Sequence, residues 1–306
     1  MAIIQAEHLT KRYKRTVALD DLNFAVEQGE LYGIIGPDGA GKTTLMRILA
    51  TLLKPDAGTA RMAELDVVND YKAIRDIIGY MPGRFALYQD LTVEENLRFF
   101  ASVFGTTVEE NYHLVADIYR HIEPFKKRRA GRLSGGMKQK LALCCALIHK
   151  PRVLLLDEPT TGIDPVSRHE LWDMLARLRQ EGISVVATTP YMDEAARCDR
   201  IALMLGGRFM DVDTPQGIAT RYRGHIWAVR ADGMRRLAAD LRSFGGTASA
   251  FSFGDAYHVT PAEGTAPGEL RRHLEARGHT HISIEETQPT VEDCFMWLAK
   301  KTEDGK

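Results

Sequence analysis

A glycine-rich segment near the N-terminus matches the pattern G-x-x-x-x-G-K-[ST], whose residue types and spacing suit the binding of a phosphate. Its residues are Gly36, Pro37, Asp38, Gly39, Ala40, Gly41, Lys42, Thr43 and Thr44. Glycines let backbone N–H groups turn toward a phosphate, where side chains would block the approach. Lys42 can then reach the β- and γ-phosphates of a nucleotide, and the Thr43 hydroxyl can ligate Mg²⁺. The segment predicts a binding site for a nucleoside triphosphate.

Two acidic residues follow an apolar run in the middle of the chain. Val153–Leu156 predicts a buried strand, and Asp157 and Glu158 come directly after it. A carboxylate there lies at the carboxyl edge of the sheet, beside the glycine-rich segment. Asp157 can hold Mg²⁺ in that place, and Glu158 can orient or deprotonate an attacking water. The alternative is that the two acidic residues only end a strand.

The elements that must position these residues indicate an α/β fold. Two further apolar strands are predicted, Leu31–Ile35 directly before the glycine-rich segment and Ile183–Thr188 after the acidic pair. A helix is predicted from Lys42 onward, and its N-terminus adds positive potential to the phosphate site. Uninterrupted apolar strands separated by helical stretches predict a mostly parallel sheet that is covered on both faces.

The pattern changes after Asp213, and Asp211–Pro215 is interpreted as a domain boundary. The residues beyond it predict strand, helix, strand, strand, helix, strand and helix. Their ranges are 225–230, 233–243, 248–251, 256–260, 267–277, 281–285 and 290–300. The first six have the order βαββαβ of a ferredoxin-like unit, so a small α+β domain is expected over 214–306. His279 and His281 have no acidic or cysteine companion nearby in the sequence, which favours a structural role over a metal site.

Length and composition fit a globular protein of about two domains. Of the 306 residues, 44% are hydrophobic and 26% are charged. Because 40 basic and 41 acidic residues give a net charge of −1, the overall charge offers no argument for binding nucleic acid. The basic run Lys126–Arg129 is interpreted as a solvated turn between helices, with a binding patch as the alternative.

The cysteines and the hydropathy bear on the compartment. Cys144, Cys145, Cys198 and Cys294 form no C-x-x-C pair, which suits a reducing compartment and argues against a zinc site. The first residues lack a charged region followed by a long apolar core, so a signal peptide is not expected. No window holds about 18 consecutive apolar residues, and any membrane role is therefore expected to come through another chain.

A third motif, Leu133-Ser134-Gly135-Gly136-Met137-Lys138-Gln139, precedes a predicted helix and lies upstream of the acidic pair. Together the three motifs resemble the nucleotide-binding subunit of an ABC transporter, over residues 1 to about 213. The segment TVEDCFMWL more loosely resembles the C-terminal extension of exporter-type ATPase subunits. The resemblance implies the ABC type of P-loop NTPase fold over 1–213, with a helical subdomain over about 84–150.

In that family two ATP-binding domains pack head to tail. Each ATP, with its Mg²⁺, lies between the phosphate loop of one domain and the LSGG motif of the other. The resemblance implies that Leu133, Ser134, Gly135 and Gly136 serve the partner's nucleotide, next to a positive helix end. It also places Asp164, in the D-loop, at the dimer seam.

Two further family positions concern adenine and the membrane. Tyr13 lies where the family stacks an aromatic ring on adenine, although an ordinary surface tyrosine is the alternative. Leu91–Leu97 resembles the segment that leads into the helical subdomain, which contacts the membrane permease subunits in the family. The same residues also predict a capped helix start, with Thr92 as the cap and Glu95 three residues later. The resemblance implies a peripheral subunit at the cytoplasmic face of the inner membrane.

Two positions depart from the family pattern. Gly83 stands where a Gln normally contacts Mg²⁺ or the water, and Pro190 stands where the switch segment normally has His. Proline has no side-chain hydrogen-bonding group and no backbone N–H, so it can neither contact a γ-phosphate nor hold a water. A positioned proton-handling side chain contributes about 10²–10⁴ in rate. We therefore predict firm Mg-ATP binding with slow turnover; the alternative is that the changes are tolerated because Glu158 remains.

The departures also bear on the partner. A weak site of its own together with an intact LSGG favours a heterodimer whose second ATPase domain brings its own Gln and His, with a homodimer as the alternative. Asp38, where Asn or Ser is usual, adds a negative charge near the seam. Two other functions are the alternatives: a soluble ABC ATPase acting on nucleic acid or ribosomes, and a regulatory ATP clamp with negligible hydrolysis. The first would need a twin cassette, a coiled-coil insertion or a basic arm, and the sequence shows none of them.

Overall fold

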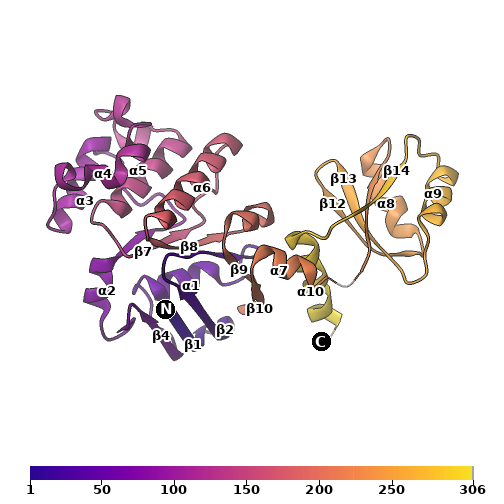
Figure 1. Ribbon diagram of the computed structural model, residues 1–306, viewed down its shortest axis with the longest axis horizontal. Coiled ribbons are helices and arrows are strands. Elements are labelled where there is room, and N and C mark those ends of the chain that lie inside the picture. Colours follow the sequence, from indigo (N-terminus) through magenta and orange to yellow (C-terminus); the bar gives the residue numbers. More distant parts are fainter. Residues whose placement is uncertain (223, 305–306) are drawn as a thin grey trace. The chain divides into compact units, whose positions relative to one another are not determined.

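The computed structural model describes residues 1–222 and 224–304, and it divides into two compact units, Met1–Pro215 and Gln216–Lys306 (Figure 1). The predicted boundary at residue 213 lies two residues before this division. None of the helices that the described residues form is long and apolar enough to cross a lipid bilayer.

Two sheets form the frame of the first unit. A six-stranded sheet has the order β10-β9-β3-β8-β7-β6, and a four-stranded antiparallel sheet has the order β2-β1-β4-β5. The strands are β1 (Ala2–Tyr13), β2 (Thr16–Glu27), β3 (Leu31–Ile35), β4 (Ala57–Met62), β5 (Leu65–Asp66), β6 (Ile78–Met81), β7 (Val153–Asp157), β8 (Ser184–Thr189), β9 (Arg200–Leu205) and β10 (Arg208–Asp213).

The six-stranded sheet is parallel except for its edge strand. β6, β7, β8, β3 and β9 pair in parallel, and β10 pairs with β9 in the antiparallel sense. Every residue of β3, β7 and β8 is buried, which explains why apolar residues fill most of their positions and no exposed polar face alternates with them. The predicted mostly parallel sheet is therefore confirmed.

Helix α1 (Lys42–Leu49) follows β3 through the glycine-rich segment and packs between elements of both sheets. Its buried face consists of Leu45, Met46, Ile48 and Leu49. These residues share one core with apolar residues of β1, β2, β3, β8 and β9. This core holds α1 in place, so the glycine-rich segment at its N-terminus is attached to a rigid helix.

The helices inserted between β6 and β7 form the helical subdomain. Its members are α3 (Val93–Val103), α4 (Val108–Tyr119) and α5 (Gly135–Leu147), with the short turns η1 (Glu123–Phe125) and η2 (Ala130–Arg132). α5 contacts α3, α4 and β6, so it links the subdomain to the sheet. Thr92 caps α3, and Glu95 completes the capping box, which confirms the predicted helix start.

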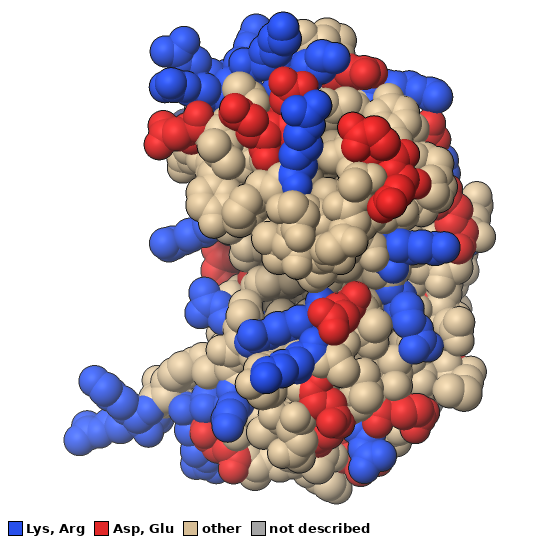
Figure 2. All heavy atoms as spheres, turned by 90° about the vertical axis from the view of Figure 1, so that its left-hand side faces the viewer, with Lys and Arg blue, Asp and Glu red and all other residues tan. Residues whose placement is uncertain are grey.

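The basic run Lys126–Arg129 lies exposed between η1 and η2. Figure 2 shows Lys and Arg side chains gathered at the outer end of the helical subdomain, above a band where acidic and basic side chains mix. The guanidinium of Arg128 stacks over the ring of Phe125 at 4.5 Å from its centroid. The run therefore forms an exposed turn between the two short helical segments.

Three other helical segments complete the first unit: α2 (Tyr71–Ile77), α6 (Pro165–Gln180) and η3 (Met192–Arg197). α6 begins with Asp164 as its N-cap and Pro165 at its first position, a combination that favours a helix start. It packs against β8 and β3. η3 follows β8 and contacts β3, so α6 and η3 both lie beside the strands that carry the phosphate-binding loop.

The second unit is an antiparallel four-stranded sheet in the order β12-β13-β11-β14. Its elements are α7 (Pro215–Thr220), β11 (Ile226–Arg230), α8 (Met234–Ser243), β12 (Thr247–Phe253), β13 (Ala256–Pro261), α9 (Pro267–Ala276), β14 (Ser283–Thr287) and α10 (Val291–Asp304). Residues of α8 and α9 share a core with inward-facing residues of the sheet. From β11 to β14 the chain order and strand order are those of a split βαβ arrangement.

His279 and His281, which the sequence singles out in this unit, have acidic partners. His279 lies 2.9 Å from Asp240, and His281 lies 2.7 Å from Asp232. These partners come from 39 and 49 residues away in the chain, so the sequence next to the two histidines does not reveal them. Each histidine forms a separate pair that ties its loop to the body of the second unit.

Candidate nucleotide-binding site

The glycine-rich segment joins β3 to α1, and two of its glycines are required by close contacts. A Cβ on Gly36 would lie 2.1 Å from the carbonyl oxygen of Met204. Gly41 has φ of +111°, and a Cβ there would lie 2.4 Å from the carbonyl oxygen of Ala18. The amide of Gly36 donates to the carbonyl of Thr189 at 3.2 Å, which fixes the start of the loop to the end of β8.

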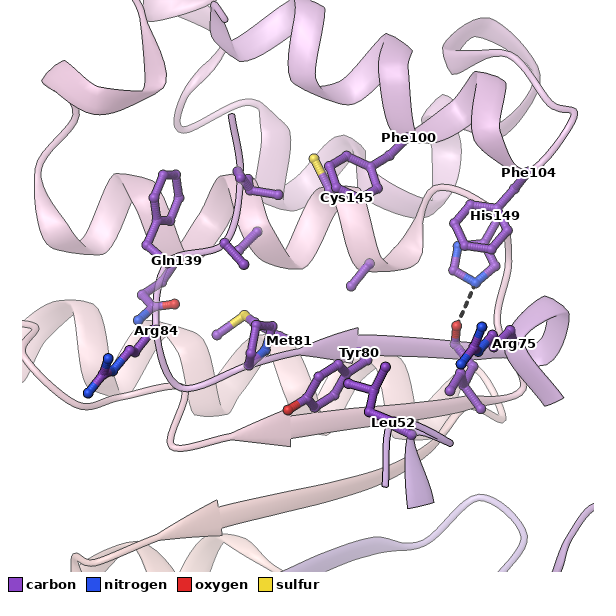
Figure 3. Close-up of a pocket in the computed structure, with 18 residues that line it drawn as sticks. Leu52, Arg75, Tyr80, Met81, Arg84, Phe100, Phe104, Gln139, Cys145 and His149 are labelled. Atoms are coloured by element: carbon purple, nitrogen blue, oxygen red, sulfur yellow. Dashed lines mark hydrogen bonds between the residues drawn. The ribbon is translucent and has the colours of Figure 1, made fainter. Parts of the chain in front are cut away.

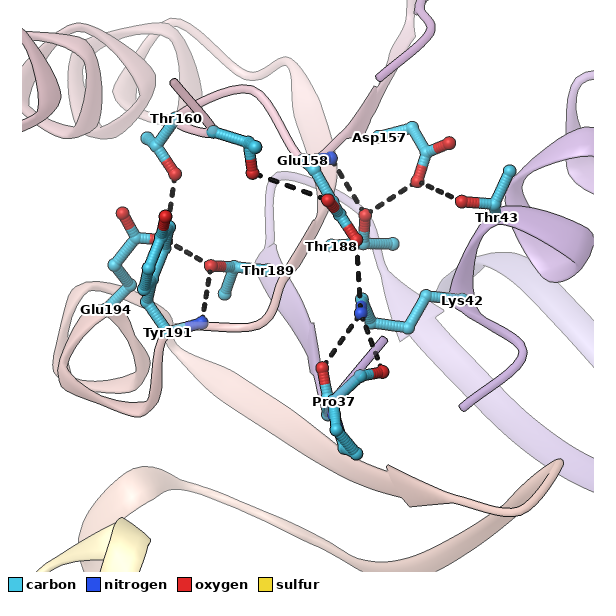
Figure 4. A network of polar contacts seen from close by, with 12 residues as sticks. Pro37, Lys42, Thr43, Asp157, Glu158, Thr160, Thr188, Thr189, Tyr191 and Glu194 are labelled. Carbon is cyan, nitrogen blue, oxygen red and sulfur yellow. Dashed lines mark hydrogen bonds and ion pairs between the residues drawn. The ribbon is translucent and has the colours of Figure 1, made fainter. Parts of the chain in front are cut away.

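Lys42 is buried at the centre of the loop, with 3% of its side chain exposed (Figure 4). Its Nζ donates to the carbonyl oxygens of Gly36 and Pro37, at 2.8 and 3.1 Å. The same ammonium lies 3.1 Å from a carboxylate oxygen of Glu158. These three oxygens accept the hydrogen bonds that the Lys42 ammonium would donate to a phosphate. The lysine is therefore already oriented toward the loop.

Asp157 and Thr43 supply oxygen atoms that suit Mg²⁺. Thr43 Oγ1 donates to Asp157 Oδ1 at 3.2 Å, and Thr188 Oγ1 donates to the same oxygen at 2.9 Å. Burial raises the pKa of Asp157, against the opposing effect of these two hydroxyl donors. A buried carboxylate with a disfavoured charge beside a hydroxyl is a fitting pair of ligands for a hard divalent cation.

Glu158 sits in a strained backbone conformation beside this pair. Its φ is +52°, in the left-handed region that residues with a side chain rarely adopt. Its amide donates to Thr188 Oγ1 at 2.9 Å, and one carboxylate oxygen accepts from Thr161 Oγ1 at 3.3 Å. Glu158 is therefore placed by its neighbours and not by its own preference, as is common at functional sites.

The two departing positions lie at the ends of the strands that carry this site. Gly83 follows β6, and a Cβ there would lie 3.1 Å from the carbonyl oxygen of Asp157 and 3.7 Å from its Oδ2. A side chain at position 83 would thus reach the carboxylate, and glycine offers none. Pro190 follows Thr189 at the end of β8. Gln89, a glutamine six residues after Gly83, does not take the place of the missing side chain. Its carbonyl accepts from the amide of Gly131, so it belongs to the helical subdomain.

The LSGG motif begins α5. Ser134 is the N-cap, and its hydroxyl accepts from the amide of Met137 at 3.4 Å. Ser134 and Gly135 are exposed, whereas Leu133 is buried. The helix starts at Gly135, two residues earlier than the predicted Met137. Two glycyl residues and a hydroxyl at an exposed helix N-terminus offer donors to an anion.

The D-loop packs against this motif within the same chain. Asp164 caps α6, accepting from the amide of Ser167 at 2.9 Å and from its hydroxyl at 2.7 Å. A Cβ on Gly136 would lie 2.6 Å from Ser167 Oγ, so the glycine is needed for α5 to approach α6. Lys140 and Glu170 join the same two helices with an ion pair of 2.6 Å. The two segments form one packed body.

The remaining candidates lie on the surface. Tyr13, at the end of β1, has 43% of its side chain exposed, and Lys11 Nζ lies 5.9 Å from its ring centroid. Asp38 and Gly39 are exposed at the tip of the loop, where Gly39 has φ of +80°. Ala40 is buried below them. Thr44, in the first turn of α1, is half-buried.

The roles of several polar residues around the site were not predicted from the sequence. Thr188 and Thr189 end β8, and both are fully buried. Thr160 and Glu194 are buried as well and share a hydrogen bond of 3.1 Å. A run of hydroxyls at the carboxyl end of an apolar strand was the available signal, because buried hydroxyls there must find partners.

Comparisons with known proteins agree on one family. The ABC transporter family model matches residues 19–161. The probable multidrug ABC transporter ATP-binding protein YbhF of Escherichia coli K12 is 38% identical over 303 residues, covering 97% of this chain and 52% of that protein. Nod factor export ATP-binding protein I of Burkholderia orbicola is 39% identical over 221 residues, covering 71% of this chain and 73% of that protein.

Solved structures give the same result. An ATP-binding subunit of an ABC transporter is 26% identical with a TM-score of 0.66, covering 72% of this chain and 92% of that one. A dimeric bacterial ABC transporter cassette is 27% identical with a TM-score of 0.63, covering 69% and 98%. The fold and these motifs together define a P-loop NTPase of the ABC type. The chain belongs to the family of ABC transporter ATP-binding proteins, and it spans about half the length of the E. coli relative.

Proposed function

We propose that this chain is the ATP-binding subunit of an ABC exporter, peripheral to the cytoplasmic face of the inner membrane. In this proposal it binds Mg-ATP at a head-to-tail dimer seam and couples ATP binding and hydrolysis to transport by separate membrane subunits. The observation that carries it is the convergence of Lys42, Thr43, Asp157 and Glu158 on the glycine loop. The relatives named for multidrug and Nod factor export support the direction of transport.

The chemistry follows from the contacts in the loop. An incoming phosphate replaces the carbonyl oxygens of Gly36 and Pro37 as the acceptor of the Lys42 ammonium. That exchange also releases Glu158 from its ion pair with Lys42. Glu158 is then free to orient an attacking water and accept its proton. Mg²⁺, held by Thr43 and Asp157, supplies charge neutralisation on the phosphates.

Turnover in this site is proposed to be slow. Position 83 faces the Asp157 carboxylate but carries no side chain, and position 190 carries no side-chain donor or acceptor and no backbone N–H. Only Glu158 remains to handle the water. Binding rests on Lys42 and the loop backbone, which are complete, so affinity is expected to be kept while the hydrolysis rate falls.

The exposed LSGG motif supports a role in the partner's site. Ser134 and Gly135 are exposed at the start of α5, as a motif that meets another chain's nucleotide requires. A heterodimer whose second ATPase domain has Gln and His at the two departing positions would use this motif fully. We propose such a partner, and we propose no nucleic-acid partner.

A groove beside β6 supports docking of the membrane subunits (Figure 3). It has a volume of about 380 Å³ and lies between the end of β6 and the helices α3 and α5. Phe100 faces it from α3 and Phe104 from the residue after that helix, and Tyr80 and Met81 face it from β6. The residues of β6 that line the groove continue directly into Gly83. A segment of a membrane subunit bound in the groove would therefore be coupled to the nucleotide site.

The test combines binding with single-turnover hydrolysis. Calorimetry should show saturable Mg-ATP binding by the full chain, and hydrolysis measured with protein in excess over radiolabelled ATP should be slow. Mixing with an ABC subunit that carries the Gln and the His should give fast hydrolysis. Ser134→Arg should abolish that gain but not ATP binding, whereas Ser102→Arg, on an exposed serine of α3, should leave it intact.

Two results would overturn parts of this proposal. Fast hydrolysis by the unmixed chain would contradict the slow-site interpretation. Absence of Mg-ATP binding would contradict the proposal as a whole. Binding with no hydrolysis in any mixture would instead identify a regulatory ATP clamp.

A further inference from the structure

A buried carboxylate in the switch segment, to which the sequence motifs assign no role, lies behind the site. Glu194, in η3, is 3% exposed. Figure 4 shows it pointing away from Lys42, toward Thr160 and Thr189. A buried acidic side chain is rare unless it is paired and hydrogen-bonded, so its partners identify what it holds.

One carboxylate oxygen of Glu194 joins two segments of the site. Thr160 Oγ1 donates to Oε2 at 3.1 Å, and Thr189 Oγ1 donates to the same oxygen. Thr160 lies two residues after Glu158, and Thr189 directly precedes Pro190. The two segments that carry the water-handling positions therefore share a single acceptor.

The other carboxylate oxygen faces α6. Arg168 Nε lies 3.6 Å from Glu194 Oε1, and neither atom has another hydrogen-bond partner among the described residues. The same guanidinium stacks over the ring of Tyr191 at 4.2 Å from its centroid. Arg168 is four residues after Asp164, and its amide donates to the Asp164 carbonyl at 3.0 Å. The D-loop is thereby connected to the same carboxylate.

The network also reaches the phosphate loop. Thr189 accepts from the amide of Tyr191 at 3.0 Å through its hydroxyl, which closes the turn around Pro190. Through its carbonyl it accepts from the amide of Gly36 at 3.2 Å. A displacement of Thr189 would therefore move the turn at position 190 and the first residue of the loop together.

We propose that Glu194 is a positioning residue, which locks the Glu158–Asp164 segment, the turn at Pro190 and the start of α6 into one arrangement. The inference rests on the proposed function for its catalytic consequence. Because Pro190 has no polar side chain that could contact the nucleotide, this network is what holds the turn and Glu158 in register with the phosphate loop.

The first test is hydrogen exchange of the nucleotide-free full chain, which is independent of hydrolysis. Glu194→Ala should speed amide exchange in residues 158–164 and 188–194 together, by about tenfold or more, because both lose one acceptor. Residues of α1 should not change. Asp193→Ala is the matched control: the neighbouring carboxylate also lies 3.5 Å from Arg168, but 73% of its side chain is exposed. Faster exchange confined to η3 would contradict the proposal.

The second test measures single-turnover hydrolysis and Mg-ATP affinity in the same variants. Because a misplacement of about 1 Å can cost about 10²-fold in rate, Glu194→Ala should lower the rate about 10–100-fold with the Kd within twofold of the unchanged chain. Glu194→Gln, which keeps an oxygen acceptor for both threonines, should recover part of the rate. Thr160→Val should lower it in the same direction if Glu194→Ala fails to fold.

The outcomes separate this inference from the proposed function. Equal rates for Glu194→Ala and Asp193→Ala would overturn the positioning role while ATP binding stands. A rise in Kd equal to the fall in rate would show general loss of the site and would likewise overturn it. If the unchanged chain binds Mg-ATP but hydrolyses none in a single turnover, the catalytic half of the inference is wrong and the exchange result decides the structural half.

Discussion

The nucleotide site has a phosphate side, formed by the glycine loop and Lys42, and a water side, which includes positions 83 and 190. The two sides differ in the groups that they offer a ligand. On the phosphate side, Gly36 and Gly41 admit no side chain, and Lys42 is buried with three oxygen partners. On the water side, positions 83 and 190 supply no polar side-chain atom. Backbone donors and a buried charge hold a ligand without help from the loop ends, whereas water must be held by side chains at those ends. Binding and turnover are therefore separable in this chain.

The largest expected effect is on the phosphate side. Lys42→Ala removes the one buried ammonium of the loop, and two lost charge-assisted hydrogen bonds at about 1.5–3 kcal/mol each correspond to about 100-fold or more in Kd. Calorimetry with Mg-ATP measures this directly. Lys72→Ala, on an exposed lysine of α2, is the control. An unchanged Kd for Lys42→Ala would place the nucleotide elsewhere.

The sequence predicted those parts of the fold whose signal is local. Leu31–Ile35 matches β3 residue for residue, and the predicted strand at 153–156 lies within β7. β1 and β2 were not foreseen. Their ladder shifts register at several points, among them Ala6/Leu9 and Lys11/Arg12, so the alternation that marks a half-buried strand is broken.

The same distinction applies to the site. The glycine loop and the strand that ends in Asp157 are contiguous motifs, so the sequence predicted their residues. Glu194 and Arg168 gain their roles only when segments about 30 residues apart meet, as the hydrogen bond between Thr160 and Glu194 illustrates. No spacing rule reveals such contacts, because tertiary packing and not local periodicity creates them.

On the water side, Pro190→His should raise the single-turnover rate. A positioned imidazole typically contributes about 10²–10⁴ in rate, and we expect about 10–100-fold because Gly83 remains. Pro190→Ala is the matched control, since it removes the proline without adding an imidazole. If both variants gain equally, the proline ring and not the missing histidine limits turnover. No gain in either would mean that the water side is complete as it stands.

The next effect concerns the LSGG motif, which we propose serves the partner's site. Gly136→Ala places a Cβ 2.6 Å from Ser167 Oγ, so the hydroxyl must rotate away from Asp164 or α5 and α6 must move apart. Such overpacking costs about 1–3 kcal/mol of folding free energy, measured by denaturant unfolding. Gly268→Ala, where a Cβ meets nothing within 4 Å, should cost nothing. The Kd of this chain for Mg-ATP should not change; if it does, the motif also serves its own loop.

The smallest expected effect lies in the groove beside β6, at a histidine that belongs to neither side of the site. His149 donates from Nε2 to the carbonyl of Ile78 at 2.8 Å and stacks on Phe104 at 3.8 Å between ring centroids. Burial lowers the pKa of His149 below its ordinary value of 6.5, against an opposing effect of the Ile78 carbonyl and Asp76. The neutral ring is therefore the native form.

The sign of the pH dependence follows from that preference. The unfolded chain binds the proton more readily, so the stabilisation is fully present above pH 6.5 and is lost as the pH falls from 6.5 toward the lowered pKa. His149→Gln should reduce the fall in Tm between about pH 6.5 and pH 5 by about 1–3 °C, and His113→Gln, on an exposed histidine of α4, should not. The Kd for Mg-ATP at pH 7 should be unchanged in both. A change in that Kd would mean that the groove is already coupled to the phosphate side in the isolated chain.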